Sequence, residues 1–274
     1  MTQERKQDAI YVVGDGERER QRLQNQGDAI RPFTRQLFEN AGIRPGMRVL
    51  DVGCGMGDVA LLAAEMVGPT GSVVGVDKNA DVLKAARRRA PSNVSFQAGD
   101  IRTLGLDSEF DAVVGRAVLM YQQDAAETIA SAIQNLLPGG IVAFQEPDFT
   151  TGGGVGVPQS LLQKQLWDWS IETFRRAGME IHMGFKLRKA FVAAGLPEPG
   201  LQANSVIGGG PGWIGYRNAE DLFRSMLPLM ESLGVTTADE VQIDTLAERL
   251  EASIVDLDGT AMFSTWIGAW TRKE

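Results

Sequence analysis

The stretch Val49–Gly57, which reads VLDVGCGMG, joins an apolar strand-like run to a turn with three glycines. Glycine has no Cβ, so such a turn lets a ligand approach the backbone closely. Its spacing is G-x-G-x-G, whereas dinucleotide-binding sheets use G-x-G-x-x-G. Asp51, two positions before Gly53, would repel a pyrophosphate but could bind an ammonium group or its water shell. The loop therefore favours a cationic cofactor.

Short apolar runs alternate with helical segments on both sides of this loop. This alternation is typical of repeated β-α-β units with right-handed connections. It predicts an α/β fold, a Rossmann-like, doubly wound and mostly parallel sheet. The predicted strands are Arg48–Gly53, Ser72–Asp77, Val94–Ala98, Phe110–Gly115 and Ile141–Glu146, and the crossover helices are Val59–Val67, Ala80–Arg89 and Ala125–Leu137.

The segments outside this alternation divide the chain into three predicted parts. Residues 1–45 form an N-terminal helical appendage over the cofactor, 46–150 the Rossmann-like core, and 151–274 a helical cap with the remaining strands. The appendage carries helical patterns near Glu17–Gln26 and Ile30–Ala41. The last part is predicted to hold helices at Pro158–Ala177, Lys186–Ala194, Ala219–Leu233 and Ala238–Val255, a strand at Gly200–Ile207 and an apolar run at Met262–Trp270.

Composition limits the partners. A formal net charge of −8 over 274 residues opposes attraction to phosphate backbones and disfavours a nucleic-acid substrate. One cysteine and one histidine leave no internal disulfide and no zinc cluster. No stretch reaches the length of a membrane span or a signal-peptide core, so a cytoplasmic protein without membrane insertion is expected. Self-association into a homo-oligomer stays open because no coiled-coil heptads are present.

Acidic residues follow the next two predicted strands. Asp77 closes Ser72–Asp77, where a carboxylate can accept hydrogen bonds from both hydroxyls of a ribose. Asp100 follows Val94–Ala98 and could accept from the amino group of adenine, while Ile101 packs on the ring. Neither signal is decisive alone. Together with the glycine loop, in this order, they predict an adenosine-containing cofactor.

These residues resemble the class I S-adenosylmethionine-dependent methyltransferases, particularly the small-molecule branch with the ubiquinone-biosynthesis-type enzymes. The resemblance covers Arg48–Glu146. It implies that the loop Asp51–Gly57 holds the methionine portion of the cofactor, and that Arg116 lies closest to it after the fourth strand. The cofactor-binding residues implied here are Asp51, Gly53, Cys54, Gly55, Gly57, Asp77 for the ribose, Lys78 beside the adenine, Gly99, Asp100, Ile101 and Arg116.

The N-terminal stretch resembles a leader that folds over the cofactor in some of these enzymes. Tyr11 would then make a cation–π contact with the sulfonium, and Gln26 would reach the methionine portion. A frayed tail is the competing interpretation for Tyr11. The basic run Lys84–Arg89 is best explained as a solvated helix face.

The sequence lacks motifs of other methyltransferase branches, which limits the classes of acceptor molecule. The residues after the fourth strand do not form an Asn/Asp-Pro-Pro-aromatic motif, which counts against methylation of nucleic-acid bases. Cys54 lies in the cofactor loop and is a poor candidate for covalent attack on a pyrimidine. No carboxylate-rich site for a metal-dependent catechol reaction can be assembled.

The acceptor should meet the cofactor beyond the carboxyl ends of the strands. Glu146 and Asp148 at the fifth strand could act there as bases or orient a hydroxyl, although such residues are also ordinary caps. His182 is a third candidate base, with a structural or solvent-exposed role as its alternative. Tyr121 and Trp213 are the predicted substrate-binding residues. The glycines at 152–154 could form a lid hinge or a flexible surface loop.

The prediction is thus a methyltransferase of class EC 2.1.1 that converts S-adenosylmethionine to S-adenosylhomocysteine. Its acceptor would be a small, largely apolar aromatic, isoprenoid or polyketide-like molecule of small-molecule or secondary metabolism, methylated in line and with carbon among the candidate atoms. Two alternatives stay open: an NAD(P)-dependent oxidoreductase, and a protein of the same fold without methyl transfer.

Overall fold

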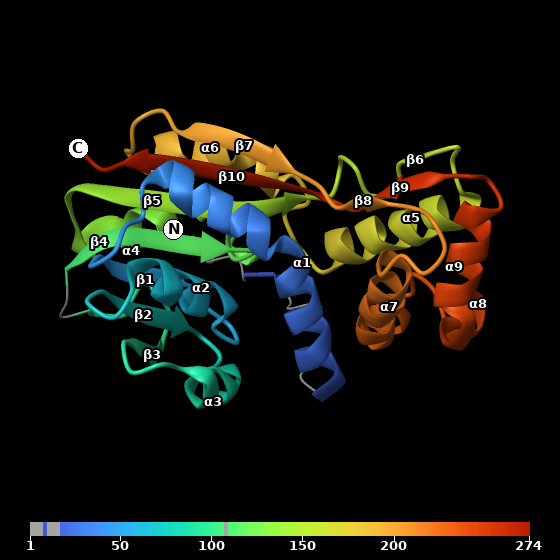
Figure 1. Ribbon diagram of the computed structural model, residues 1–274, viewed down its shortest axis with the longest axis horizontal. Coiled ribbons are helices and arrows are strands. Elements are labelled where there is room, and N and C mark those ends of the chain that lie inside the picture. Colours follow the sequence, from blue (N-terminus) through green and yellow to red (C-terminus); the bar gives the residue numbers. More distant parts are fainter. Residues whose placement is uncertain (1–7, 10–16, 107–108) are drawn as a thin grey trace, which may run out of the picture. The chain divides into compact units, whose positions relative to one another are not determined.

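The computed structural model describes residues 8–9, 17–106 and 109–274, which form two compact units (Figure 1). The sheet unit contains Ile30–Pro147, Met183–Ala203 and Trp266–Glu274. The second unit contains the described residues up to Ala29, together with Asp148–His182 and Asn204–Thr265. Each unit combines segments that are distant in the sequence. The predicted parts 1–45, 46–150 and 151–274 are instead consecutive stretches of the chain, and that division stays a prediction.

A seven-stranded sheet with the order β3-β2-β1-β4-β5-β10-β7 forms the sheet unit. The pairs β3–β2, β2–β1, β1–β4 and β4–β5 are parallel. The end of β10 bonds to the beginning of β5, with Gly139 N–H donating to Lys273 O and Lys273 N–H donating to Gly140 O, so β10 runs antiparallel to β5 (Figure 1). The predicted doubly wound, mostly parallel sheet is confirmed. The strands are β1 Arg48–Val52, β2 Ser72–Asp77, β3 Val94–Ala98, β4 Phe110–Arg116, β5 Leu136–Asp148, β7 Gly200–Asn204 and β10 Thr265–Arg272.

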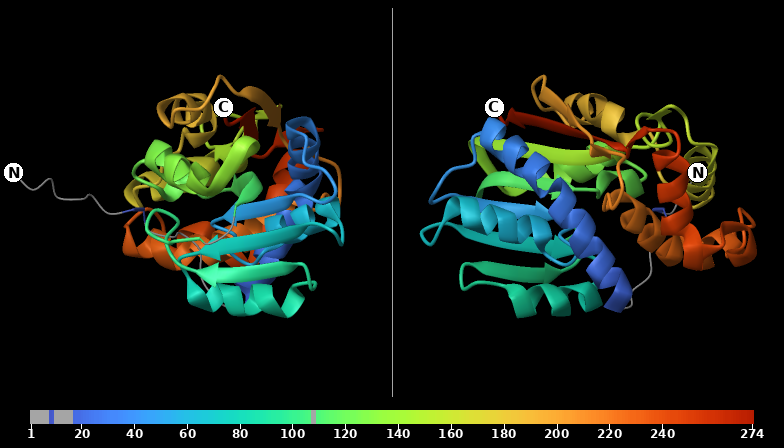
Figure 2. Two further views of the ribbon diagram at one scale, coloured as in Figure 1. Left: turned by 90° about the vertical axis from the view of Figure 1, so that its left-hand side faces the viewer. Right: turned by 45° about the vertical axis from the view of Figure 1, so that its right-hand side comes forward.

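Helices cover both faces of this sheet (Figure 2). The C-terminal part of α1 Glu17–Ala41 lies on one face with α2 Asp58–Val67 and α3 Ala80–Arg89, and α4 Ala125–Ala132 and α6 Met183–Ala193 lie on the other. Leu37 and Phe38 of α1 are fully buried in the same core as Val49 of β1 and Leu62 of α2. Burying such side chains contributes about 1.5–3 kcal/mol each, which fixes the helices on the strands.

The second unit contains a small antiparallel sheet and most of the remaining helices. Its strands are β6 Gly156–Val157, β9 Thr260–Met262 and β8 Ile207–Gly208, with β9 in the centre. Its helices are α5 Leu161–Arg176, α7 Gly215–Ser232, α8 Ala238–Val241 and α9 Leu246–Val255. None of the helices among the described residues is long and apolar enough to cross a membrane.

Several predicted element bounds need correction. The two helical patterns of the appendage form the single helix α1, which continues through the buried Gly27 and the exposed Pro32. Burial of Ile30, which lies between these two weak helix formers, and of Phe38 further along the helix compensates for them. The predicted strand Gly200–Ile207 is divided between β7 and β8, and the predicted helix Ala238–Val255 is interrupted at Gln242, whose φ is +49°.

The fifth strand begins earlier than predicted. β5 includes the turn Leu137–Gly140 because Leu136 pairs with Phe110 and because Gly139 and Gly140 bond to Lys273. The register of β4 and β5 shifts between Phe110 and Ala112. Gly139, with a φ of +76°, absorbs the irregular backbone there.

Candidate functional site

The candidate site is the crevice at the carboxyl ends of β1 and β4, within the sheet unit. The chain leaves β1 toward β2 on one side, while β4 pairs with β1 on the other side. At such a switch point the two loops diverge and leave room for a ligand. Asp51 and the glycine loop come from β1, and Arg116 comes from the end of β4.

The glycines of the loop are required for different reasons. Gly53 has a φ of +66°, and a Cβ there would lie 2.8 Å from the Cβ of Val118, in the segment after β4. Gly57 has a φ of +86°, and its Cβ would lie 2.8 Å from the ring of Phe96. Gly55, with a φ of +50°, differs because a Cβ there would meet no described heavy atom within 4 Å. The loop is therefore packed against neighbouring side chains at Gly53 and Gly57 and is open at Gly55.

Cys54 faces the interior of the sheet. The side chain is buried, and a Cβ on Gly75 of β2 would lie 2.8 Å from its Sγ. Burial, with the nearby Asp51 and Asp77 charges, raises the pKa of the Cys54 thiol far above its ordinary value. The thiol stays protonated at neutral pH, which agrees with the expectation that it is no nucleophile.

Asp51 is a buried carboxylate without a hydrogen-bond partner among the described residues. The side chain is 1% exposed, and neither oxygen has a hydrogen-bond partner among the described residues. Burial raises the pKa of Asp51 well above its ordinary value, and the charges of Asp77 and Asp58 raise it further. The Arg116 guanidinium lowers the pKa of Asp51. The Ala60 amide lowers it too, although it does not form a hydrogen bond with the carboxylate. An ammonium group on the ligand would supply what this carboxylate lacks.

Arg116 joins a polar group on the face of the sheet that α1 covers. Its Nη1 donates to Thr34 Oγ1 of α1 at 3.1 Å, and Thr34 Oγ1 donates to Gln145 Oε1 of β5 at 2.6 Å. Gln145 Nε2 is buried and has no partner among the described residues. Helix α1 is thus tied to the ends of β4 and β5 beside Asp51.

Asp77 links the end of β2 to the glycine loop. Its Oδ2 accepts from Gly55 N–H at 2.8 Å, and its Oδ1 accepts from Asn79 N–H at 2.9 Å. Each carboxylate oxygen can accept further bonds. Asp77 is half-buried, so its carboxylate is partly accessible, and its role in binding a ribose stays a prediction.

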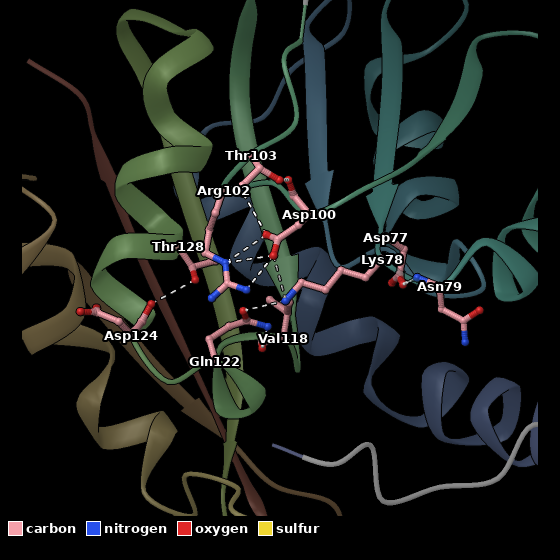
Figure 3. Close-up of polar contacts among 10 residues, drawn as sticks. All are labelled: Asp77, Lys78, Asn79, Asp100, Arg102, Thr103, Val118, Gln122, Asp124 and Thr128. Carbon is pink, nitrogen blue, oxygen red and sulfur yellow. Dashed lines mark hydrogen bonds and ion pairs between the residues drawn. The ribbon is translucent and has the colours of Figure 1, made fainter. Parts of the chain in front are cut away.

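Asp100 already has cationic partners (Figure 3). Arg102 Nε and Nη2 donate to its carboxylate at 3.0 and 2.6 Å, and Lys78 Nζ lies 3.3 Å from its Oδ2. The hydrogen bond from Arg102 holds the pKa of Asp100 well below its usual range. Lys78 Nζ also donates to Gln122 Oε1 at 3.4 Å, so the loops after β2, β3 and β4 are joined here. Adenine would share Asp100 with Arg102.

Two arginines of α3 contribute contacts that the sequence analysis missed. Arg89 Nη1 lies 2.7 Å from Asp58 Oδ1 and donates to Met56 O at 3.3 Å, in and just after the glycine loop. Arg87 Nη2 donates to Phe96 O at 3.0 Å. The basic run is therefore not only a solvated face. The sequence did not indicate the contacts of Arg87 and Arg89, because they depend on how α3 packs on β3.

Glu146 bonds to the turn after β4. Its carboxylate accepts hydrogen bonds from the backbone N–H groups of Val118, Leu119 and Met120. Burial raises the pKa of Glu146 to about 7 against the lowering effect of these donors. Tyr121, half-buried, ends the 3-10 helix Leu119–Tyr121 that begins in this turn.

The other predicted acceptor-side residues belong to the second unit. Asp148 Oδ1 accepts from Thr150 N–H at 2.9 Å and from the Thr150 hydroxyl. His182 is exposed, and its backbone N–H donates to Glu180 Oε1. Trp213 stacks on Phe263 with ring centres 5.3 Å apart. The structure leaves the predicted catalytic and substrate-binding roles of these residues as predictions.

The remaining predicted residues are placed only in part. Gly99 and Ile101 flank Asp100 in the turn after β3, and both are half-buried. Gln26 lies within α1. Tyr11 lies outside the described residues. In the stretch 152–154, predicted as a hinge or surface loop, Gly153 and Gly154 are packed against Trp167, whereas a Cβ on Gly152 would lie 2.7 Å from Phe263 O.

The fold and this crevice define a Rossmann-like protein whose glycine loop and acidic strand ends suit a cationic adenosine cofactor. A family model described as a methyltransferase domain matches residues 43–182. The chain therefore belongs to the methyltransferase domain family, and the predicted resemblance to S-adenosylmethionine-dependent methyltransferases is confirmed.

Individual relatives agree with this assignment. The chain is 32% identical over 158 residues to the aklanonic acid methyltransferase DauC of Streptomyces, which covers 53% of this chain and 72% of that protein. It is 36% identical over 130 residues to the ubiquinone/menaquinone biosynthesis C-methyltransferase UbiE of Pseudomonas aeruginosa, which covers 44% of this chain but only 51% of that protein. The fold resembles phospholethanolamine N-methyltransferase 2 of Haemonchus contortus, solved with S-adenosylhomocysteine, with a TM-score of 0.53, 18% identity and coverage of 91% and 52%.

Proposed function

We propose that this protein transfers the methyl group of S-adenosylmethionine to a small, largely apolar acceptor. The observation that carries the proposal is the buried Asp51 carboxylate, which has no hydrogen-bond partner among the described residues and begins a glycine loop that is open at Gly55. A buried anion without a partner is costly unless a ligand compensates for it. The ammonium group of the cofactor's methionine portion has the matching charge.

The residues of the crevice fit the whole cofactor. Asp51 and the loop Gly53–Gly57 would hold the amino-acid portion, Asp77 the ribose, and Asp100 with Ile101 the adenine. When bound, S-adenosylmethionine supplies a methyl group activated by positive sulfur. The protein's part is then to orient the acceptor in line with that methyl group and to exclude water.

The acceptor is proposed to be an aromatic, isoprenoid or polyketide-like molecule. Support comes from two relatives, the aklanonic acid methyltransferase DauC and the ubiquinone/menaquinone biosynthesis C-methyltransferase UbiE. Tyr121 and Trp213 are the proposed acceptor contacts, and Asp148 and His182 the proposed proton acceptors. Carbon is the proposed acceptor atom, following the C-methyltransferase relative.

Transfer of a labelled methyl group tests this proposal. The full chain is incubated with methyl-labelled S-adenosylmethionine and a panel of polyketide, quinone-precursor and isoprenoid acceptors, and the labelled product is analysed by mass spectrometry. We expect label in at least one acceptor, on a carbon atom. Label found only on oxygen or nitrogen would refute the carbon assignment. Cofactor binding with no transfer to any member of the panel would refute the acceptor class.

A further inference from the structure

One buried side chain joins the last residues of β5 to the turn after β4. Glu146 Oε1 accepts from Val118 N–H at 3.0 Å and from Leu119 N–H at 2.9 Å, and Oε2 accepts from Met120 N–H at 3.2 Å. The first donors of a helical turn lack partners within the helix. The Glu146 carboxylate is fully buried and accepts hydrogen bonds from three such N–H groups, so it caps the turn.

The turn itself has an unusual backbone. Ala117 has a φ of +53°, a left-handed conformation that non-glycine residues rarely adopt. Its N–H donates to Gln145 O at 2.9 Å, so two successive residues of β5 fix the turn. A strained conformation persists only where the surrounding structure holds it in place. The three bonds to Glu146 are a direct source of that restraint.

The held turn contacts the glycine loop. A Cβ on Gly53 would lie 2.8 Å from Val118 Cβ, so the Val118 side chain rests against the backbone of Gly53. Gln122 Nε2 donates to Val118 O at 3.5 Å, and Lys78 Nζ donates to Gln122 Oε1, which extends the contact toward the end of β2 (Figure 3). Release of the turn would therefore change the shape of the loop and of its neighbours.

We propose that Glu146 is a positioning residue, which holds the turn 117–120 against the glycine loop and so sets the geometry of the cofactor site. The identity of the cofactor in this proposal rests on the proposed function. The contacts of Glu146 with the turn, and of Val118 with Gly53, do not depend on it. It replaces the role of general base, because the carboxylate oxygens are directed at backbone donors. Glu146 then affects the reaction through Val118 and Gly53.

The variants Glu146→Gln and Glu146→Ala test this role. Glutamine keeps an oxygen that can accept from Val118 and Leu119, whereas alanine leaves three buried N–H groups without a partner. Asp124→Ala is the matched control, because it removes the carboxylate that accepts from Glu127 N–H at the start of α4 without touching the turn. Amide hydrogen exchange of residues 118–120 and calorimetric titration with S-adenosylhomocysteine are measured at pH 8 for all three.

We expect the amides of residues 118–120 to exchange faster in Glu146→Gln and faster still in Glu146→Ala, with normal exchange in Asp124→Ala. The dissociation constant should rise about threefold in Glu146→Gln and about tenfold or more in Glu146→Ala. If Glu146→Ala does not fold, Glu146→Gln still decides the question. Unchanged exchange at residues 118–120 in Glu146→Gln would overturn the proposal.

Kinetics separate positioning from proton transfer. For a positioning residue, saturating cofactor restores the kcat of Glu146→Gln to within about threefold of the wild type, and the loss appears in KM. A general base would instead lose about 10²–10⁴-fold in kcat with an unchanged dissociation constant, which would overturn the proposal. A wild-type protein that does not bind S-adenosylhomocysteine would refute the proposed function, while the exchange experiment would still decide the role of Glu146.

Discussion

Asp51 is the residue on which the proposed cofactor site most depends. Its carboxylate is buried, has no hydrogen-bond partner among the described residues and lies beneath the cofactor loop. Burial without a partner disfavours the ionised form. In the proposed function a cationic ligand would compensate for this cost, and the sequence signal for Asp51 was its place before Gly53.

We expect Asp51→Asn to weaken S-adenosylhomocysteine binding about tenfold or more, because the charge-assisted bond to the ammonium group is lost. The ligand-free variant should be as stable as the wild type or more stable, by about 1 kcal/mol, since a buried charge is removed. Calorimetry and urea unfolding measure the two effects. Asp111→Asn, at the opposite end of β4, is the control and should leave binding unchanged.

Glu146 predicts a pH dependence of stability. Burial raises the pKa of Glu146 from 4.5 to about 7. A raised folded-state pKa means that the contribution of the group is fully present below the unfolded value and is lost as pH rises through the folded value. The free energy of unfolding should fall between about pH 5 and pH 7.5 by ~2–3 kcal/mol more in the wild type than in Glu146→Gln. Urea unfolding across this range that gives parallel curves for the two proteins would refute the assignment.

The glycines of the loop should differ in what they contribute. Gly53→Ala brings a Cβ against Val118 and should destabilise the protein by about 2–4 kcal/mol as well as abolish binding. In Gly55→Ala the new Cβ contacts no described atom, so the free energy of unfolding should fall by only about 1 kcal/mol. The methyl group would, however, occupy space proposed for the ligand. Gly195→Ala, also at positive φ with no described atom within 4 Å, is the control for backbone strain. Normal binding by Gly55→Ala would contradict the placement of the cofactor.

At the scale of elements, α3 supports the cofactor loop. Arg89 reaches back to Met56 O and Asp58, across the start of α2. We expect Arg89→Ala to raise the dissociation constant of S-adenosylhomocysteine about fivefold, because a partly exposed ion pair and one hydrogen bond are lost. Arg88→Ala, at the exposed neighbouring position, serves as the control. Equal affinities of the two variants would show that α3 does not hold the loop.

The elements nearest the loop were predictable from sequence because local signals agreed with the fold. Ser72–Asp77, Ala80–Arg89 and Val94–Ala98 have the predicted bounds, since short apolar runs and a capping Asn79 mark them. The continuous α1 was not predicted, because Gly27 and Pro32 suggest a break that burial of the helix overrides. The partners of Glu146 were not predictable either, since backbone donors of a turn leave no mark in the sequence.

At the scale of the whole molecule, the chain passes between the two units within continuous elements. Helix α1 crosses at Ala29 and β5 crosses at Pro147. The described residues proposed to bind the cofactor belong to the sheet unit, apart from Gln26, whereas Asp148, His182 and Trp213 belong to the second unit. Cofactor affinity should therefore respond chiefly to substitutions in the sheet unit.

The most direct test of the central claim is calorimetric titration of the full chain with S-adenosylhomocysteine and, separately, with NADH. We expect saturable binding of S-adenosylhomocysteine in the wild type, its loss in Gly55→Ala, and no binding of NADH, because Asp51 and the G-x-G-x-G spacing oppose a pyrophosphate. Binding of NADH without S-adenosylhomocysteine would contradict the account and favour an oxidoreductase.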